Sequence, residues 1–290
     1  MNSSKSRTKP PNGEASKLTA DEQSAVAQPE EVLSSVEGRT LLLRLNRPES
    51  RNALSDTMLA QLWDRMHAAL TNPEILVVVL TGDERCFCAG GDLKASGGST
   101  LTPFDRHLSR FADSRLHEFA RRLAHYPKPV IAAIEGYCLG GGLEIALLCD
   151  FCVASESAQL GLTEARHGLV PVLGGAWSLA RCVGARRAKE MLFTAARVDA
   201  HEALRMGLLN HVVQKGQALP KALDIAARVA ASAPLSVRAI KQAVDRSFDQ
   251  SFEQALETAN EWSTMLGFSE DRREGLEAFM AKREPRFRGV

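Results

Sequence analysis

The sequence predicts an α/β fold with a largely parallel sheet, followed by a helical C-terminal segment. Two continuous apolar runs, Ile75–Thr81 and Val130–Glu135, have the length of strands that are buried on both faces. Helical patterns separate the strands, and this alternation is typical of a parallel sheet. From Gly184 onward the pattern is mostly helical, which indicates a cap or an assembly region.

Composition describes an ordinary globular protein. The 290 residues suffice for one large domain with a small appendage, and 44% of them are hydrophobic. Lys and Arg number 36 against 35 Asp and Glu, so no overall charge favours binding to nucleic acid or to an anionic membrane. No apolar run reaches the ~18 residues that a membrane-spanning helix requires.

Residues 1–30 are polar, and we expect them to form a disordered tail. They lack the apolar centre of a secretory signal, and their acids (Glu14, Asp21, Glu22) count against a mitochondrial transit peptide. We therefore expect a cytoplasmic protein whose six cysteines are reduced. Cys149 and Cys152 have the spacing of a metal-binding pair, but no second pair follows, so we interpret them as buried structural residues and expect no metal site.

The first half of the fold begins with a predicted β-hairpin over 31–37 and 39–45, which turns at Gly38. A loop rich in Pro and Asn spans 46–52. Ser55 or Asp56 can cap a helix that extends to about residue 70, because its apolar residues form one stripe. The buried strand at 75–81 comes next.

A second predicted helix covers 103–125 and ends at Tyr126-Pro127-Lys128-Pro129, where two prolines break it. The glycine-rich segment after residue 135 leads into a short helix over 142–148. Strands are then predicted at 151–155 and 159–161. Further helices are expected at 185–193, 199–206, 219–231, 235–248, 252–265 and 269–282.

Two glycine-rich turns follow apolar strands. One is Cys88-Ala89-Gly90-Gly91-Asp92, and the other is Gly140-Gly141-Gly142-Leu143-Glu144. Because glycine lets backbone N–H groups approach a ligand closely, two such turns can form an oxyanion hole. Glu164 follows Glu144 by 20 positions (164 − 144), and two carboxylates beside an oxyanion hole suit proton transfer through an enolate-like intermediate.

Structural explanations compete with this one. The dinucleotide fingerprint G-x-G-x-x-G and the G-K-[ST] ending are absent. Taken alone, Glu144 is an acid favoured at a helix start, and Glu164 is a surface acid paired with Arg166 or Arg187. If the segment around Glu164 is extended, Arg166 shares its face while His167 points away.

Four segments of the chain resemble the enoyl-CoA hydratase/isomerase (crotonase) superfamily, in the order of that family. They are Leu45–Leu54, Cys86–Lys94, Pro127–Glu144 and Gly161–Pro171. The resemblance implies a crotonase-like spiral of ββα units over 31–200 and a helical C-terminal region over 201–290 for assembly. Such proteins usually form trimers or pairs of trimers.

The resemblance also implies the site. The backbone N–H groups of Gly91 and Gly141 correspond to the two oxyanion donors, and Glu144 and Glu164 correspond to the catalytic glutamates. The residues expected along coenzyme A are Arg51, Ala53, Ala89, Gly91, Asp92, Leu93, Lys94 and Gly141, joined by Phe279 and Lys282 of a neighbouring subunit. Lys282 with Arg283 can equally be a cation pair at a helix C-terminus.

The activity implied is the addition of water to an α,β-unsaturated acyl-CoA, with no cofactor beyond the coenzyme A of the substrate. Isomerisation or hydrolysis of another CoA thioester on the same fold is an alternative. A non-catalytic binding protein, including an RNA-binding variant, is a third hypothesis.

Two departures bear on the acyl group. Where the family often has Gly-Ala-Gly-Gly-Thr-Gln-Arg-Leu, this chain has Val172–Leu179, with Trp177 in place of the glutamine. Gly97-Gly98-Ser99-Thr100 is expected to form a mobile loop over the acyl group. Both affect which substrate is bound rather than which reaction occurs.

Overall fold

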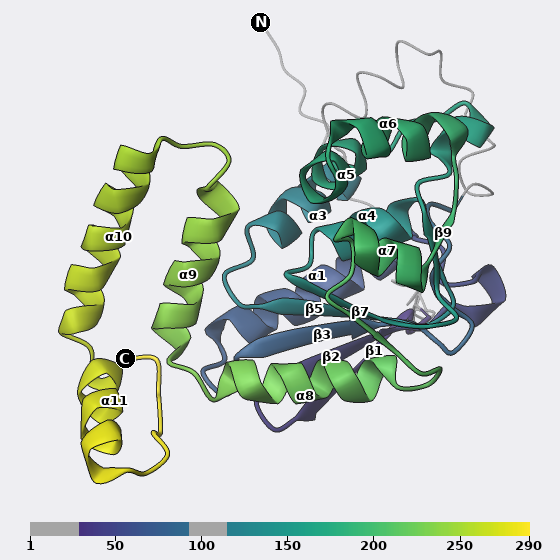
Figure 1. The fold of residues 1–290 in the computed structure, drawn as a ribbon. Coiled ribbons are helices and arrows are strands. Elements are labelled where there is room, and N and C mark those ends of the chain that lie inside the picture. The colour runs from purple at the N-terminus through teal and green to yellow at the C-terminus, as the bar shows by residue number, and fades with distance from the viewer. Residues whose placement is uncertain (1–28, 93–114) are drawn as a thin grey trace, which may run out of the picture.

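The computed structural model describes residues 29–92 and 115–290. Within these ranges two sheets form the centre of the fold (Figure 1). The larger sheet has the strand order β1 (Val32–Glu37), β2 (Thr40–Leu45), β3 (Val77–Thr81), β5 (Val130–Ile134), β7 (Phe151–Ser155), β10 (His211–Val213). The smaller sheet has the order β4 (Cys86–Cys88), β6 (Tyr137–Leu139), β8 (Gln159–Gly161), β9 (Val198–Asp199).

Successive strands alternate between the two sheets. β3, β5 and β7 pair in the larger sheet, while the strand that follows each of them, β4, β6 or β8, pairs in the smaller one. All of these pairs are parallel, and the antiparallel pairs lie at the edges, β1 with β2 and β8 with β9. Two strands per turn followed by a helix make a ββα unit, so the predicted spiral is confirmed.

The helices surround these sheets and then continue past them. In chain order they are α1 (Asp56–Thr71), α3 (Arg115–Ala124), α4 (Gly141–Leu147), α5 (Gly175–Val183), α6 (Ala185–Thr194), α7 (Ala200–Met206), α8 (Ala218–Ala230), α9 (Pro234–Arg246), α10 (Phe252–Gly267) and α11 (Glu270–Ala281). The described residues also contain two 3₁₀ turns, η1 (Pro48–Ser50) and η2 (Glu164–His167).

Most predicted elements are confirmed within two or three residues. The helix predicted from Ser55 or Asp56 begins at Asp56, and the Ser55 hydroxyl accepts a hydrogen bond from the Met58 amide at 3.0 Å. The sequence did not predict β6, β9 and β10, which are three residues long or shorter. Of the helix predicted over 103–125, the part at 103–114 lies outside the described residues.

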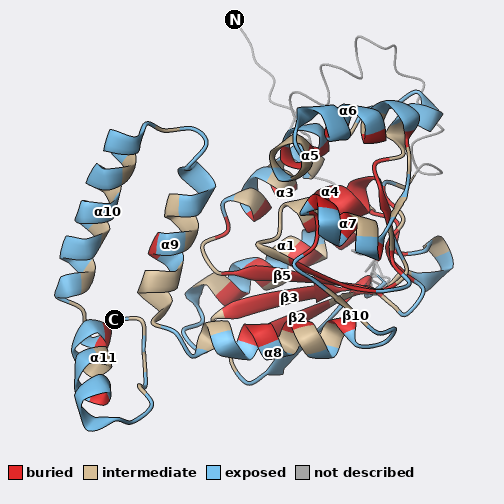
Figure 2. Cartoon of the chain, viewed as in Figure 1, coloured by how far each residue is buried: buried red, intermediate tan, exposed pale blue. Residues whose placement is uncertain are grey.

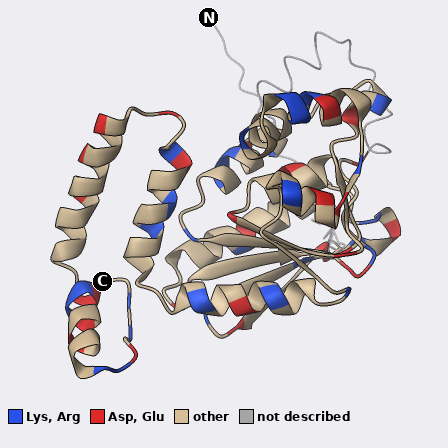
Figure 3. Ribbon diagram, viewed as in Figure 1, with Lys and Arg blue, Asp and Glu red and all other residues tan. Residues whose placement is uncertain are grey.

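The central strands are apolar throughout because both faces of the larger sheet are covered. Val78 and Leu80 of β3 belong to one hydrophobic cluster with α1 and α3, whereas Val77 and Val79 face a second cluster with α8. Figure 2 shows these strands as buried between helices whose outer faces are exposed. Basic and acidic residues are interspersed on α6 and α8 (Figure 3), which leaves these outer faces without one dominant charge.

The C-terminal helices divide into two groups. α8 packs on the larger sheet, and β10 is its edge strand. In Figure 1, α9, α10 and α11 extend beyond the sheets as an arm. The predicted division at residue 200 stays a proposal, and the packing of β10 and α8 favours a later boundary, after Ala230.

A half-buried ion pair joins the arm to the core. The Lys241 ammonium of α9 contacts the Asp150 carboxylate, and these side chains are 10% and 17% exposed. Asp150 also accepts the backbone N–H of Val130 at 2.7 Å, at the start of β5. Burial raises the pKa of Asp150, and the Lys241 charge acts in the opposite direction.

None of the helices in the described ranges combines the length and the apolar character needed to cross a bilayer.

We expect Lys241→Met to lower the free energy of unfolding by about 3 kcal/mol, because it leaves a buried carboxylate without its cation. Urea denaturation of the two proteins measures the difference. Lys221→Met is the matched control, since it removes an exposed pair with Asp224 and is expected to change stability by less than about 0.5 kcal/mol. Equal effects of the two substitutions would contradict a structural role for the Lys241 pair.

Candidate active site

Three neighbouring parallel strands of the smaller sheet bring the candidate residues together. β4 pairs with β6, and β6 pairs with β8. Gly91 follows β4, Gly141 follows β6, and Glu164 follows β8. Because parallel strands end at the same edge of a sheet, residues about 70 positions apart in sequence (164 − 91 = 73) meet at one place.

The two glycine turns are in close contact. Gly90 has φ +105°, and a Cβ on it would lie 3.3 Å from the Gly141 nitrogen. A Cβ on Gly141 would lie 3.6 Å from the Gly91 nitrogen. The two amides predicted as oxyanion donors are therefore adjacent, and a side chain on Gly90 or Gly141 would contact the other turn.

Hydrogen bonds to one carbonyl of each turn set the direction of these two N–H groups. The Gly90 carbonyl accepts the Leu54 N–H at 2.8 Å, and the Gly140 carbonyl accepts the Glu144 N–H at 3.0 Å. In a trans peptide the C=O and the next N–H point in opposite directions, so the Gly91 and Gly141 N–H groups point away from those donors. Within residues 29–92 and 115–290 neither N–H donates to a protein acceptor, and both are available to a ligand oxygen.

Glu144 is held in a fixed orientation by backbone donors. Its side chain is buried, and its carboxylate accepts the N–H groups of Leu173 at 2.7 Å, Gly175 at 2.8 Å and Val172 at 3.3 Å. Burial raises the pKa of Glu144, while these three hydrogen bonds act to lower it. A carboxyl group whose pKa lies above its ordinary value suits acid–base chemistry near neutral pH.

The carboxylate of Glu164 accepts fewer hydrogen bonds than that of Glu144. Its Oε2 is buried and has no hydrogen-bond partner among the described residues. A Cβ on Gly140 would lie 3.3 Å from its Oε1, so the side chain lies directly against the second glycine turn. Burial raises the pKa of Glu164, and the nearby charge of Glu144 raises it further. The two carboxylates are thus close enough for the charge of one to affect the other. They differ in the number of hydrogen bonds that they accept.

The segment around Glu164 is not extended, and that prediction is wrong. Glu164 begins the 3₁₀ turn η2, which Gly168 ends in the left-handed conformation at φ +65°. With three residues per turn, Arg166 does not share the side of Glu164. Glu164 forms no ion pair with Arg166 or Arg187 in the described part of the chain, so the surface-pair explanation is also excluded.

The residues predicted along coenzyme A divide into three groups. Arg51, Ala53, Ala89 and Asp92 lie beside the first glycine turn, where the Ala89 N–H donates to the Arg51 carbonyl at 3.0 Å. Leu93 and Lys94 lie outside the described residues, as does the predicted loop at 97–100. Phe279 and Lys282 belong to the arm, and in Figure 1 α11 is far from α4, so the chain does not bring them to its own glycine turns.

The cysteines contribute packing rather than chemistry. Cys149 and Cys152 donate their thiols to the carbonyls of Ile145 at 3.3 Å and Ala146 at 3.1 Å. Burial raises the pKa of Cys152 to about 12, which keeps it protonated. Among the described residues no group of three or more His, Cys, Asp or Glu side chains could hold a metal ion.

Residues 36–290 match the enoyl-CoA hydratase/isomerase family. The chain belongs to this family. Among its relatives, 2,3-dehydroadipyl-CoA hydratase of Escherichia coli K12 is 39% identical over 259 residues, covering 89% of this chain and 99% of that protein. The mitochondrial methylglutaconyl-CoA hydratase of Mus musculus is 33% identical over 290 residues, covering 97% and 88%.

Solved structures of the enoyl-CoA hydratase/isomerase family agree with the fold. An enoyl-CoA hydratase from Bacillus anthracis has a TM-score of 0.84 at 35% identity and covers 90% of this chain and all of its own. One from Polaromonas sp. JS666 has a TM-score of 0.83 at 36% identity, covering 89% and 99%.

Sequence reasoning missed the three amides that hold Glu144. They lie in Val172–Gly175, which drew attention only as a departure in sequence. Gly175 was the available signal, because a Cβ on it would lie 2.7 Å from Cγ and 2.8 Å from Oε1 of Glu144. Only glycine lets the backbone donate to the carboxylate at this distance.

We expect Gly175→Ala to lower kcat by about 100-fold, because the added methyl displaces the Glu144 carboxylate from its hydrogen bonds. Steady-state kinetics on an enoyl-CoA measures the loss. Gly38→Ala is the control for a strained glycine substitution away from the site: Gly38 has φ +58°, so alanine strains the turn between β1 and β2, but its Cβ would have no neighbour within 4 Å and kcat should stay unchanged. Unchanged kcat in Gly175→Ala would show that Glu144 tolerates displacement.

Proposed function

We propose that this chain is a hydratase that adds water across the double bond of an α,β-unsaturated acyl-CoA. The observation that carries the proposal is the pair of adjacent N–H groups of Gly91 and Gly141, which have no acceptor within residues 29–92 and 115–290, beside the carboxylates of Glu144 and Glu164. The hydratases named among its relatives from Escherichia coli and Bacillus anthracis support the same reaction class.

The thioester oxygen lies between the two N–H groups in this mechanism. As water attacks Cβ, negative charge moves onto that oxygen, and each backbone donor stabilises it by about 3–4 kcal/mol. Because these donors are fixed by Gly90 and Gly140 carbonyl contacts, they need not reorganise when the charge develops. The two N–H groups therefore stabilise the enolate-like state more than they stabilise the bound substrate.

The two glutamates handle the protons. Glu144, ionised and oriented by three amides, accepts a proton from the attacking water while the water oxygen forms the bond to Cβ. Glu164 delivers a proton to Cα as the enolate electrons return to that carbon; its raised pKa favours the protonated form this requires. The product is a 3-hydroxyacyl-CoA, and exchange with solvent restores both carboxyl groups. Coenzyme A enters as part of the substrate, and no further cofactor takes part.

We expect Glu144→Gln and Glu164→Gln each to lower kcat by about 10²- to 10⁴-fold, because each removes one proton-transfer group. Loss of the enoyl absorbance measures turnover on crotonyl-CoA, 2,3-dehydroadipyl-CoA and 3-methylglutaconyl-CoA. Glu135→Gln is the matched control, since Glu135 is also a buried glutamate with an unpartnered oxygen but contacts the amides of Gly216 and Ala218.

Product analysis on the same panel separates the alternatives. A shifted double bond or a free acid would identify an isomerase or a hydrolase, and in that case one glutamate is expected to be dispensable. No turnover of any thioester would favour a non-catalytic binding protein. A gel-shift assay at low salt addresses its RNA-binding form, which the interspersed charges disfavour.

We further propose that the chain acts as a trimer or a pair of trimers in which the arm reaches a neighbouring subunit. The arm exposes many large apolar side chains, and such a surface usually marks an interface. These residues are Ile240, Val244, Phe248, Phe252, Leu256, Met265, Phe268, Leu276, Phe279 and Met280. Lys282, at the end of α11, then reaches a phosphate of the neighbour's coenzyme A.

We expect sedimentation to show a trimer or hexamer, and Phe268→Glu combined with Met280→Glu to shift it toward monomer by burying charge in the interface. Lys282→Ala should raise KM for crotonyl-CoA but not for crotonyl-pantetheine, which lacks the nucleotide phosphates. An equal rise for both substrates would contradict a phosphate contact.

A further inference from the structure

The loop of residues 47–54 is joined to the first glycine turn along its length. The Ala89 N–H donates to the Arg51 carbonyl at 3.0 Å, the Leu54 N–H to the Gly90 carbonyl at 2.8 Å, and the Asp92 N–H to the Leu54 carbonyl at 3.2 Å. The Leu54 bond fixes the peptide plane that contains the Gly91 N–H. The direction of that N–H therefore depends on where the 47–54 loop lies.

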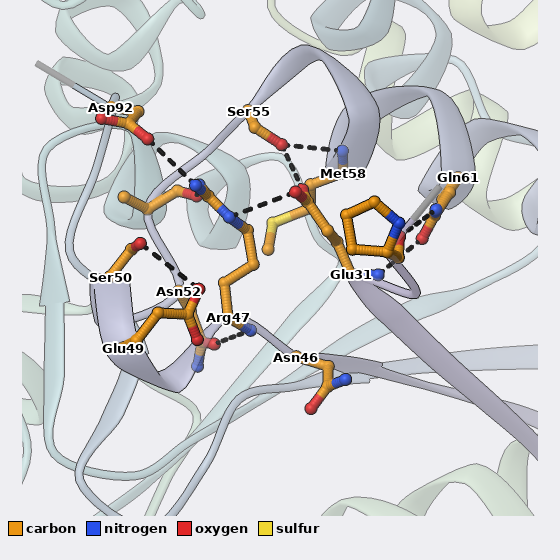
Figure 4. Close-up of polar contacts among 12 residues, drawn as sticks. Glu31, Asn46, Arg47, Glu49, Ser50, Asn52, Ser55, Met58, Gln61 and Asp92 are labelled. Carbon is orange, nitrogen blue, oxygen red and sulfur yellow. Dashed lines mark hydrogen bonds and ion pairs between the residues drawn. The ribbon is translucent and has the colours of Figure 1, made fainter. Parts of the chain in front are cut away.

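Arg47 links both segments through one guanidinium group (Figure 4). Its Nη1 donates to the Ala53 carbonyl at 2.6 Å, and its Nη2 contacts the Asp92 carboxylate at 3.1 Å. Its Nε contacts the Glu31 carboxylate at 3.3 Å. The side chains of Arg47, Glu31 and Asp92 are 16%, 11% and 18% exposed, so solvent screens these contacts little.

The remaining contacts anchor this group to rigid elements. Glu31 also accepts the hydroxyl of Ser55, which caps α1, and the Glu31 N–H donates to the Gln61 side chain at 2.9 Å. The Arg47 N–H donates to the Asn52 side chain at 2.9 Å. Figure 4 shows Glu31, Asn52 and Asp92 around Arg47, while Ser55 and Gln61 contact Glu31.

We propose that Arg47, acting through Asp92 and Ala53, is a positioning residue that sets the direction of the Gly91 N–H. This inference rests on the proposed function, because it assigns that N–H to the thioester oxygen. The planar guanidinium contacts three oxygens from three segments at once, which an ammonium cannot reproduce. Asp92 consequently serves the site through its side chain as well as through the backbone expected along coenzyme A.

The test compares Arg47→Lys and Asp92→Asn with wild type, and all proteins are first checked for an unchanged thermal unfolding profile. Both variants are expected to lower kcat on crotonyl-CoA by about 10- to 100-fold with a smaller change in KM, because the donor is misdirected rather than lost. The bound chromophore 4-(dimethylamino)cinnamoyl-CoA should show a smaller red shift, since that shift reports hydrogen bonding to the thioester oxygen. Should Arg47→Lys fail to fold, Asp92→Asn, which leaves the other two contacts of Arg47, decides the question.

Arg65→Gln is the matched control. Arg65 pairs at 3.1 Å with Glu30, the neighbour of Glu31, but contacts neither the loop nor the glycine turn. It should match wild type in kcat and in the red shift. Wild-type kcat and red shift in both Arg47→Lys and Asp92→Asn would overturn the inference.

A third readout separates this inference from the proposed function. In glycine-selective ¹⁵N spectra, the Gly91 amide resonance should move in Arg47→Lys and Asp92→Asn and stay in place in Arg65→Gln. If wild type hydrates no enoyl-CoA, the proposed function fails, and the Gly91 resonance alone decides whether Arg47 sets the turn. An unmoved resonance refutes the positioning role whatever the activity.

Discussion

The site depends on the parallel pairing of three very short strands, β4, β6 and β8. Each has three residues, and their common edge is the place where Gly91, Gly141 and Glu164 follow. The pairing requires very close approach: a Cβ on Gly142 would lie 2.4 Å from the Cys88 carbonyl oxygen, so a side chain there would push α4 away from β4. The buried apolar side chains of β4 and β6 hold the strands at this separation.

The burial that suits the two carboxyl groups to proton transfer also lowers the stability of the fold. Burial raises the pKa of both glutamates, so keeping either ionised at neutral pH costs folding free energy. Three amides offset part of that cost at Glu144, whereas at Glu164 only a hydrogen bond from its own backbone does so, and its Oε2 has no partner among the described residues. The two side chains are thus satisfied differently, which suits the proposed use of one as a base and the other as an acid.

Sequence reasoning recovered the features that local chemistry dictates. Apolar runs predicted β3 and β5, a cap residue predicted the start of α1, and glycine clusters with nearby acids predicted the site residues, whose roles remain proposals. It could not recover features that depend on distant contacts. The three-residue strands β6 and β10 are too short to show a periodicity. The donors to Glu144 are backbone groups, and Gly175 alone does not indicate which side chain that backbone contacts.

The alternation of strands between two sheets has a consequence for how such a protein diversifies. Each turn of the spiral supplies part of the site: Gly91 follows β4, Gly141 and Glu144 follow β6, and Glu164 follows β8. Insertions or exchanges in one connection leave the register of the other strand pairs intact. Selectivity for different acyl groups can thus change through one connection at a time, while the groups that carry the reaction keep their geometry.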